Sequence, residues 1–89
     1  MDGKRSFTGW ELEAHIRRLV DASRPGKSYC VLCLAEAFEI TSVQQYVTIA
    51  QALRRVGTYQ PIRYDTFQSK CVTHTGQNGA GTFWMIRKR

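Results

Sequence analysis

The sequence TSVQQYVTIAQALRRVG, residues 41–57, sets the architecture of this 89-residue chain, because it contains the clearest helix signal. Thr41-Ser-Val-Gln44 is a capping-box pattern and Ser42-Val-Gln-Gln45 is an overlapping alternative, so a helix is predicted to begin at about residue 42. Gly57 suits the C′ position that ends a helix, and Pro61 prevents a return to helix soon afterwards. We therefore predict a helix between residues 42 and 57.

This predicted helix has one apolar and one polar face, since residues three and four positions apart lie on the same side of a helix. The apolar face, which we expect to be buried, consists of Val43, Val47, Ala50 and Leu53, with Tyr46 beside them. The opposite face, which we expect to be exposed, consists of Gln44, Gln45, Thr48, Gln51 and Arg55.

Two further helices are predicted upstream. Thr8-Gly-Trp-Glu11 is a capping box, and the helix that follows it carries a buried stripe and a charged solvent face. The stripe consists of Leu12, Ile16, Leu19 and Val20, and the solvent face of Glu13, Arg17 and Arg18. Arg24-Pro-Gly-Lys27 ends this helix, because Pro lacks a donor and Gly tolerates a left-handed turn. The apolar run from Ser28 to Phe38 predicts a short, mostly buried helix, entered through one or two strand-like residues.

Downstream of Gly57 the pattern changes from helical to strand-like. Ile62, Tyr64 and Phe67 alternate with polar residues, and Thr82 to Arg87 predicts a second strand. The glycine-rich segment between the two strands, residues 69–81, predicts a loop tip. The predicted fold class is therefore α+β, with three helices followed by a β-hairpin, in a single domain over residues 1–89 whose residues 1–7 are expected to be flexible.

Basic charge is concentrated in the second half of the chain. The chain has 13 Lys and Arg against 7 Asp and Glu, which gives a net charge of +6 and a sequence pI near 9.7. Residues 1–40 carry six charges of each sign, whereas residues 41–89 carry seven basic residues and a single acid, Asp65. This distribution favours a polyanionic partner for the second half, above all nucleic acid.

Several classes of protein do not fit this composition. No apolar run is long enough to cross a bilayer, and the N-terminus has no secretory signal, so we expect a cytoplasmic protein with no membrane partner. Three cysteines agree with a reducing compartment. The sequence pairs no nucleophile with a base and contains no phosphate-binding loop, so we expect no catalytic activity.

The order of the predicted elements resembles that of winged helix-turn-helix DNA-binding modules. The residues that carry the resemblance are Tyr46-Val-Thr-Ile-Ala-Gln-Ala-Leu-Arg-Arg-Val-Gly57 followed by Phe83-Trp-Met-Ile-Arg-Lys88, within roughly residues 41–89. They are similar to the third helix and wing of modules in phage and plasmid replication proteins and related mobile-element proteins. The resemblance implies double-stranded DNA as partner, in replication, excision or transcriptional control, with the helix at 42–57 in the major groove.

The chemistry of the exposed residues agrees with that partner. Glutamine pairs bidentately with adenine, and arginine with guanine or phosphate. Loop and tail residues, His74 and Arg89 among them, would contact the DNA backbone. The predicted DNA-binding residues are Ser42, Gln44, Gln45, Thr48, Gln51, Arg54, Arg55, Arg63, Lys70, Gln77, Asn78, Arg87 and Lys88.

Two pairs of residues have the spacing of zinc ligands: Cys30-Val-Leu-Cys33 and Cys71-Val-Thr-His74. The neighbours of Cys30 and Cys33 are apolar and predicted to be helical, whereas zinc ligands usually lie on tight turns. We therefore expect these two sulfur atoms to fill core space, and we predict no metal and no other cofactor. A metal site formed by Cys30, Cys33, Cys71 and His74 stays open as an alternative.

Two other functions also stay open. The domain could bind protein in place of DNA, as an interaction module, a small inhibitor or adaptor, or a homodimer. Aromatic residues interleaved with cations could instead stack on the bases of single-stranded nucleic acid. These aromatic residues are Tyr59, Tyr64, Phe67, Phe83 and Trp84.

Overall fold

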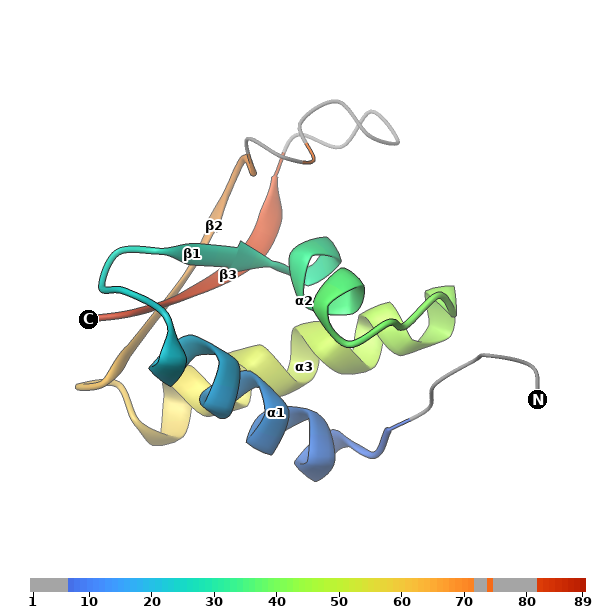
Figure 1. The fold of residues 1–89 in the computed structure, drawn as a ribbon, viewed down its shortest axis with the longest axis horizontal. Coiled ribbons are helices and arrows are strands. Elements are labelled where there is room, and N and C mark those ends of the chain that lie inside the picture. The colour runs from blue at the N-terminus through green and yellow to red at the C-terminus, as the bar shows by residue number, and fades with distance from the viewer. Residues whose placement is uncertain (1–6, 72–73, 75–81) are drawn as a thin grey trace.

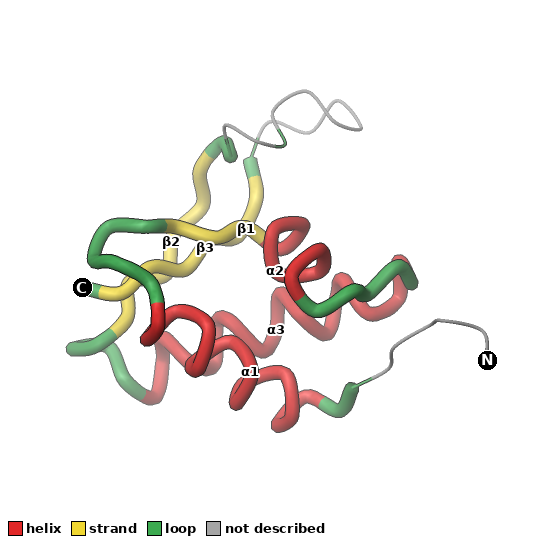
Figure 2. Tube along the Cα trace, viewed as in Figure 1, coloured by secondary structure: helices red, strands yellow, loops and turns green. Residues whose placement is uncertain are grey.

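The computed structural model describes residues 7–71, 74 and 82–89. Within these residues it contains three helices and a three-stranded antiparallel sheet, with the sheet on one side of the helices (Figures 1 and 2). The elements are α1 (Gly9–Ala22), β1 (Ser28–Cys30), α2 (Val31–Ala37), α3 (Val43–Tyr59), β2 (Tyr64–Ser69) and β3 (Phe83–Lys88). The predicted α+β class is confirmed.

Helix α1 begins and ends where the sequence predicts. The Glu11 N–H donates to the Thr8 Oγ1 at 3.4 Å, and the Thr8 N–H donates to the Glu11 Oε1 at 2.8 Å, so both halves of the capping box form. The buried residues of α1 are Leu12, Ile16 and Val20. After the helix ends, Gly26 adopts a φ of +88°, in the left-handed region that favours glycine.

Strand β1 pairs with β3, the last strand of the chain, so the sheet order is β1-β3-β2. In this register Met85 of β3 lies between Cys30 of β1 and Phe67 of β2. Residues directly opposite each other in neighbouring strands point to the same face, so these three side chains share one face of the sheet. The strand-like residues predicted before the second helix therefore form a strand of the sheet, β1. Helix α2 follows β1 without a loop.

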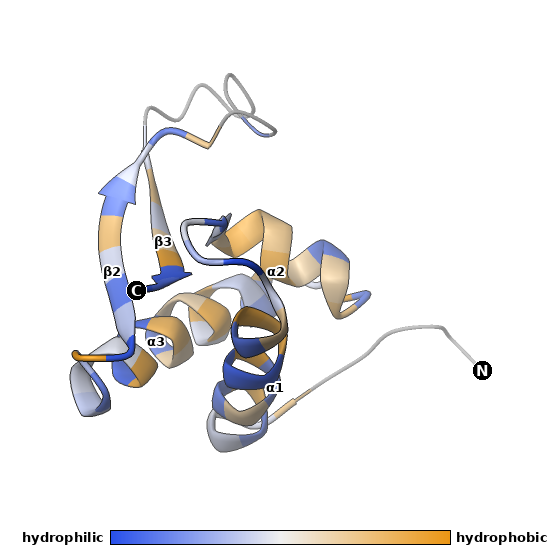
Figure 3. Ribbon diagram, turned by 60° about the vertical axis from the view of Figure 1, so that its left-hand side comes forward, coloured by the Kyte–Doolittle hydropathy of each residue, from blue (hydrophilic) through white to orange (hydrophobic). Residues whose placement is uncertain are grey.

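The main core lies between the helices and one face of the sheet. It consists of Leu12, Ile16, Val20, Val31, Leu34, Ala35, Ile40, Ile49, Ala52, Leu53, Val56, Tyr64 and Ile86. Helix α2 is apolar along most of its length, as the hydropathy colouring shows (Figure 3). A second, smaller cluster of Cys30, Cys71 and Met85, with Phe67 and Phe83 packed against it, occupies the other face of the sheet. We call this the outer face.

The buried face of α3 agrees with the predicted one at Leu53 and differs from it at the two valines. Val43 and Val47, expected to be buried, are 74% and 60% exposed. The residues of α3 that are buried are Ile49, Ala52, Leu53, Val56 and Gly57. These residues form an apolar stripe that faces α1, β2 and β3. Burial of this stripe leaves the side chains of Val43 and Val47 exposed to solvent.

The two ends of α3 also differ from those predicted. Ser42 is the N-cap residue, but its side chain makes no capping hydrogen bond, so the predicted capping box does not form. At the other end, α3 continues past Gly57 to Tyr59. A Cβ atom on Gly57 would lie 2.5 Å from the Cγ2 of Thr66. Gly57 is therefore required where the helix approaches β2 closely, and not as a C′ residue.

The remaining predictions concern the strands and the ends of the chain. Ile62, expected to face the core, is 86% exposed, because residues 61–63 form a turn before β2 begins. Strand β3 lies within one residue of its predicted position. Phe7, expected to be flexible, packs against the main core. Residues 1–6 and the predicted contacts Gln77 and Asn78 lie outside the described residues. In the described part of the chain, no helix is long and apolar enough to cross a membrane.

Candidate nucleic-acid face and thiol–histidine cluster

Three long polar side chains lie on the exposed side of α3. Gln44, Gln51 and Arg54 are all exposed, and their spacing of seven and three residues places them on one side of the helix. Val47 lies between them on the same side. Since the opposite side of α3 is buried against α1 and the sheet, the orientation of this face is fixed relative to the rest of the domain.

Other residues predicted on this face are directed elsewhere. The Phe7 N–H donates to the Gln45 Oε1 at 3.0 Å, so the Gln45 amide contacts the N-terminal segment of its own chain. Ser42 occupies the N-cap position without a side-chain hydrogen bond to the helix, and both Ser42 and Thr48 are half-buried. Gln45 therefore does not belong to the exposed face, and the partner that turns it inward is 38 residues away in the sequence.

The two adjacent arginines of α3 have different surroundings. The guanidinium carbon of Arg54 lies 4.5 Å from the ring centroid of Trp84, a cation–π arrangement in an exposed position. The Arg55 Nε donates to the Glu13 Oε2 at 2.7 Å, which joins α3 to α1. Glu13, predicted to face solvent, is thereby largely covered. The charge of Arg55 is offset by Glu13, whereas Arg54 keeps its charge at the surface.

Cations of the C-terminal half are paired with acids, two of which come from the first half. Arg63 lies 3.1 Å from the Asp21 Oδ2, and Arg87 lies 2.9 Å from the Asp65 Oδ2. The Lys88 Nζ donates to the backbone carbonyl of Asp21 at 2.9 Å. Asp21 and Glu13, both on α1, therefore lie beside cations of residues 41–89 in the folded domain. The separation of charge between the two halves of the sequence is smaller in the structure for this reason.

Four side chains from two distant segments converge beside the outer face of the sheet. The ligand atoms of Cys30, Cys33, Cys71 and His74 all lie within 4.8 Å of one another. The Cys33 Sγ lies 3.6 Å from the Sγ atoms of both Cys30 and Cys71. The His74 Nδ1 lies 3.3 Å from the Sγ of Cys30 and 3.5 Å from those of Cys33 and Cys71. All three cysteines are described, and none forms a disulfide.

Glu36 orients the imidazole of this cluster. Its Oε2 lies 3.0 Å from the His74 Nε2, and a carboxylate only accepts, so Nε2 carries a proton and Nδ1 faces the sulfur atoms. The hydrogen bond to Glu36 raises the pKa of His74. Burial raises the pKa of the Cys30 thiol to about 12 and also raises the pKa of Cys33.

The junction between β1 and α2 brings two of the thiols together. Cys30 is the last residue of β1 and the N-cap of α2, and its Sγ accepts from the Cys33 N–H at 3.3 Å. Both side chains therefore leave the same bend of the chain. Both cysteines were predicted to lie in one helix and to fill core space; Cys30 is fully buried but ends β1, and Cys33 lies in α2 and is half-buried. The signal for the cluster was the matching spacing of Cys71-Val-Thr-His74.

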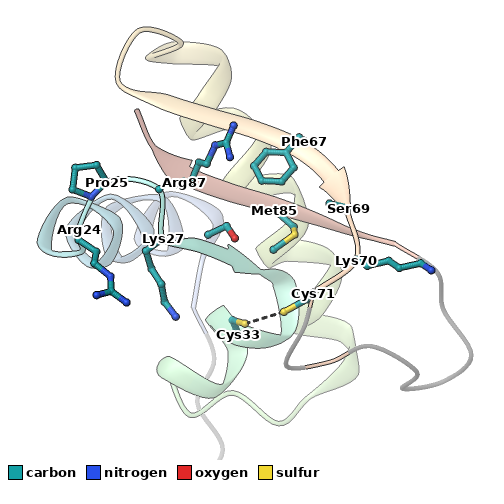
Figure 4. Close-up of a pocket in the computed structure, with 12 residues that line it drawn as sticks. Arg24, Pro25, Lys27, Cys33, Phe67, Ser69, Lys70, Cys71, Met85 and Arg87 are labelled. Carbon is teal, nitrogen blue, oxygen red and sulfur yellow. Dashed lines mark hydrogen bonds between the residues drawn. The ribbon is translucent and has the colours of Figure 1, made fainter.

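A hollow lies beside the cluster on the outer face of the sheet (Figure 4). Its apolar part includes Phe67 and Met85, and Cys33 and Cys71 form part of its wall. The basic residues that line the hollow are Arg24, Lys27, Lys70 and Arg87. Positive charge therefore gathers next to the sulfur atoms.

Comparison with known protein families, curated protein sequences and solved structures finds no match to this chain. Two features of the described residues bear on function: the exposed face of α3, with Gln44, Gln51 and Arg54, and the cluster of three thiols with His74. The first is an exposed helix surface. The second is a largely buried group of side chains that borders the hollow.

Proposed function

We propose that this protein is a winged-helix domain that binds double-stranded DNA, without catalysis of its own, through the exposed face of α3. The order of elements supports the proposal: a helix, a short strand, two helices and two strands, with β3 between β1 and β2. This is the order expected of a winged helix-turn-helix, in which the third helix enters the major groove.

The observation that carries the proposal is the set of long polar side chains on a helix docked by its opposite side. Gln44 and Arg54 are ten residues apart, which corresponds to about 15 Å of helix axis or roughly four base pairs of duplex. Glutamine and arginine are the side chains that read adenine and guanine in the major groove, whose width of about 12 Å admits one helix. The face of α3 has the length and the chemistry for this contact.

Arg54 is the residue we expect to contribute most. Its guanidinium lies over Trp84, so the side chain is held in place while its outer edge is open to solvent. A held arginine loses less side-chain entropy on binding than a free one. The net charge of +6 adds a general attraction to phosphate.

The test is a fluorescence-anisotropy titration of duplex DNA at several salt concentrations. We expect Arg54→Ala to weaken binding by about 1 to 3 kcal/mol, and to reduce the slope of log K against log salt by about 1 if Arg54 contacts phosphate. The matched control is Arg18→Ala, which removes the same charge from an exposed site on α1. No binding at low salt, or equal effects of the two substitutions, would refute the assignment to α3. Tighter binding of the separated strands would favour stacking on the aromatic residues.

A second function, protein binding, is favoured by the exposed valines of the same helix. Val43 and Val47 lie one turn apart and form an apolar strip beside Gln44. If this strip joins two copies of the chain, sedimentation will show a concentration-dependent mass that the double substitution Val43→Ser and Val47→Ser abolishes. A monomer at all concentrations rules out self-association through this strip.

A further inference from the structure

Five of the six distances among the four clustered ligand atoms match those around a single tetrahedral ion, and the sixth, between the Sγ atoms of Cys30 and Cys71, is within 4.8 Å. With Zn–S bonds of about 2.3 Å and a Zn–N bond of about 2.0–2.1 Å, a regular tetrahedron has S···S edges of about 3.8 Å and S···N edges of about 3.5 Å. Here the S···S distances from Cys33 are 3.6 Å, and the S···N distances to His74 are 3.3 to 3.5 Å. We propose that Cys30, Cys33, Cys71 and His74 bind one structural zinc ion.

Packing of neutral thiols can also bring two sulfur atoms to about 3.6 Å, so contact distance alone does not decide the matter. The position of His74 does. It is only 2% exposed, and its Nδ1 is directed at three sulfur atoms, which are weak hydrogen-bond partners for an imidazole. A buried polar atom with such partners is poorly satisfied, whereas a metal ion at the centre of the cluster would satisfy it fully.

Glu36 supplies a second, independent feature of a metal site. Histidines that bind zinc usually donate their other ring N–H to a carboxylate, which fixes the orientation of the ring. The 3.0 Å contact between the His74 Nε2 and the Glu36 Oε2 is this arrangement. Because Glu36 lies on α2, it also connects the imidazole to the helix that has Cys30 as its N-cap and contains Cys33.

The ligand set selects the metal. Three sulfurs and one nitrogen suit zinc, whereas magnesium and calcium prefer oxygen ligands. All four ligand atoms lie within 4.8 Å of one another, which accommodates one ion and is too compact for an iron–sulfur cluster whose ligands bind different irons. Four protein ligands leave no open position for water or substrate, so the ion is structural and not catalytic.

The surrounding charge agrees with an occupied site. Three thiolates, a neutral imidazole and one Zn²⁺ carry a net charge of −1. Arg24, Lys27 and Lys70 line the hollow that Cys33 and Cys71 border (Figure 4). These cations would stabilise the excess negative charge of the thiolates from the solvent side.

The ion would join parts of the fold that are otherwise weakly connected. Strand β1 has three residues and pairs only along its short length with β3, and Cys71 lies just past the end of β2. Zinc would tie the β1–α2 junction to Cys71 and His74. In a domain of 89 residues, whose core is small, such a link contributes directly to folding.

The first test needs only the wild-type chain, purified under reducing conditions without chelator from zinc-supplemented culture. Elemental analysis and native mass spectrometry should find one zinc per chain, and a strong chelator should lower the melting temperature. Cobalt substitution should give the absorption bands of a tetrahedral thiolate site. A folded, reduced protein that contains no zinc and takes up neither zinc nor cobalt overturns the proposal, and so does bound iron in place of zinc.

Substitutions test the ligands individually. Cys71→Ser and His74→Ala should abolish stoichiometric binding, whereas Met85→Leu, which changes a residue packed in the same cluster, should keep one zinc. Glu36→Gln, at a side chain that is 68% exposed and so tolerant of change, should fold and bind one zinc with about 10- to 100-fold lower affinity. Wild-type affinity in both Glu36→Gln and His74→Ala refutes the assignment. These readouts involve no DNA, so they are independent of the proposed function.

Discussion

The substitution Gly57→Ala tests how closely α3 packs on the sheet. The added Cβ would lie 2.5 Å from the Cγ2 and 2.9 Å from the Oγ1 of Thr66, distances that real Cβ atoms essentially never show. Thr66 is β-branched and lies in β2 opposite Ile86, so its side chain has little freedom to move away. The helix and the strand would have to separate.

The expected magnitude combines two opposing terms. Alanine is favoured over glycine inside a helix by about 1 kcal/mol, whereas overpacking a well-filled site costs about 1 to 3 kcal/mol. Because two contacts at Gly57 fall well below van der Waals distance, we expect the cost to be near its upper end and the net loss to be about 1 to 2 kcal/mol. For a domain of this size, each kcal/mol lowers the melting temperature by about 4 to 8 °C.

The assay is a double-mutant cycle measured by urea unfolding. Thr66→Ala removes the two closest atoms and leaves only the Cβ, at 3.3 Å, so it should relieve the clash and reveal the helix propensity of alanine. We expect a coupling of about 2 to 3 kcal/mol between the two sites, because the loss in the wild type would become a gain in the Thr66→Ala background. Additive effects would refute the reasoning, because they would mean that Gly57 is needed for its backbone conformation at a helix end and not for close packing.

Three further predictions concern other parts of the fold. Tyr64→Phe should cost about 1 to 2 kcal/mol at neutral pH, since it removes the 2.7 Å hydrogen bond to Asp21. Burial raises the pKa of Tyr64. In the wild type, the contribution of Tyr64 to stability is therefore complete below the ordinary tyrosine pKa and is lost as the pH rises through the raised value. Urea unfolding across alkaline pH should show a smaller decline of the unfolding free energy in the variant than in the wild type. Thr8→Ala should cost about 1 kcal/mol at neutral pH, because it removes the N-cap side chain. Hydrogen bonds with Thr8 lower the pKa of Glu11, so the wild-type advantage should decrease as the pH falls through that lowered value, while the hydrogen bond from the Glu11 N–H to the Thr8 Oγ1 remains; an advantage that does not change in acid would contradict this. Ile62→Ser should change stability by less than about 0.5 kcal/mol in thermal unfolding, and a larger loss would place Ile62 in the core, as its sequence alternation predicted.

Much of the secondary structure followed from local signals. The capping box at Thr8, the turn around Gly26 and the helix after Ser42 all lie where the sequence places them. These features depend on interactions between residues a few positions apart, such as a side chain that satisfies a free N–H or a glycine that accepts a positive φ. The total charge and the α+β class were also determined by the sequence alone.

The rotation of α3 and its packing on β2 were decided by tertiary structure. The helix has two apolar stripes, one through Val43 and Val47 and another through Ile49, Leu53 and Val56, and periodicity alone does not rank them. Docking of α1 and the sheet buries the second stripe and presses Gly57 against Thr66. That choice exposes the valines beside the glutamines, and so determines which side chains a partner would meet.

The cluster of three thiols and an imidazole was also decided by tertiary structure. The sequence supplies two short spacings, Cys30 to Cys33 and Cys71 to His74, and each of them alone fits a buried core as well as a ligand pair. The two pairs meet only because β1 and β2 flank β3 and the chain bends at the β1–α2 junction. Cys30 and His74, which lie in contact, are 44 positions apart in the sequence. Such contacts form only when the whole chain has folded, because no local energy term links the two segments.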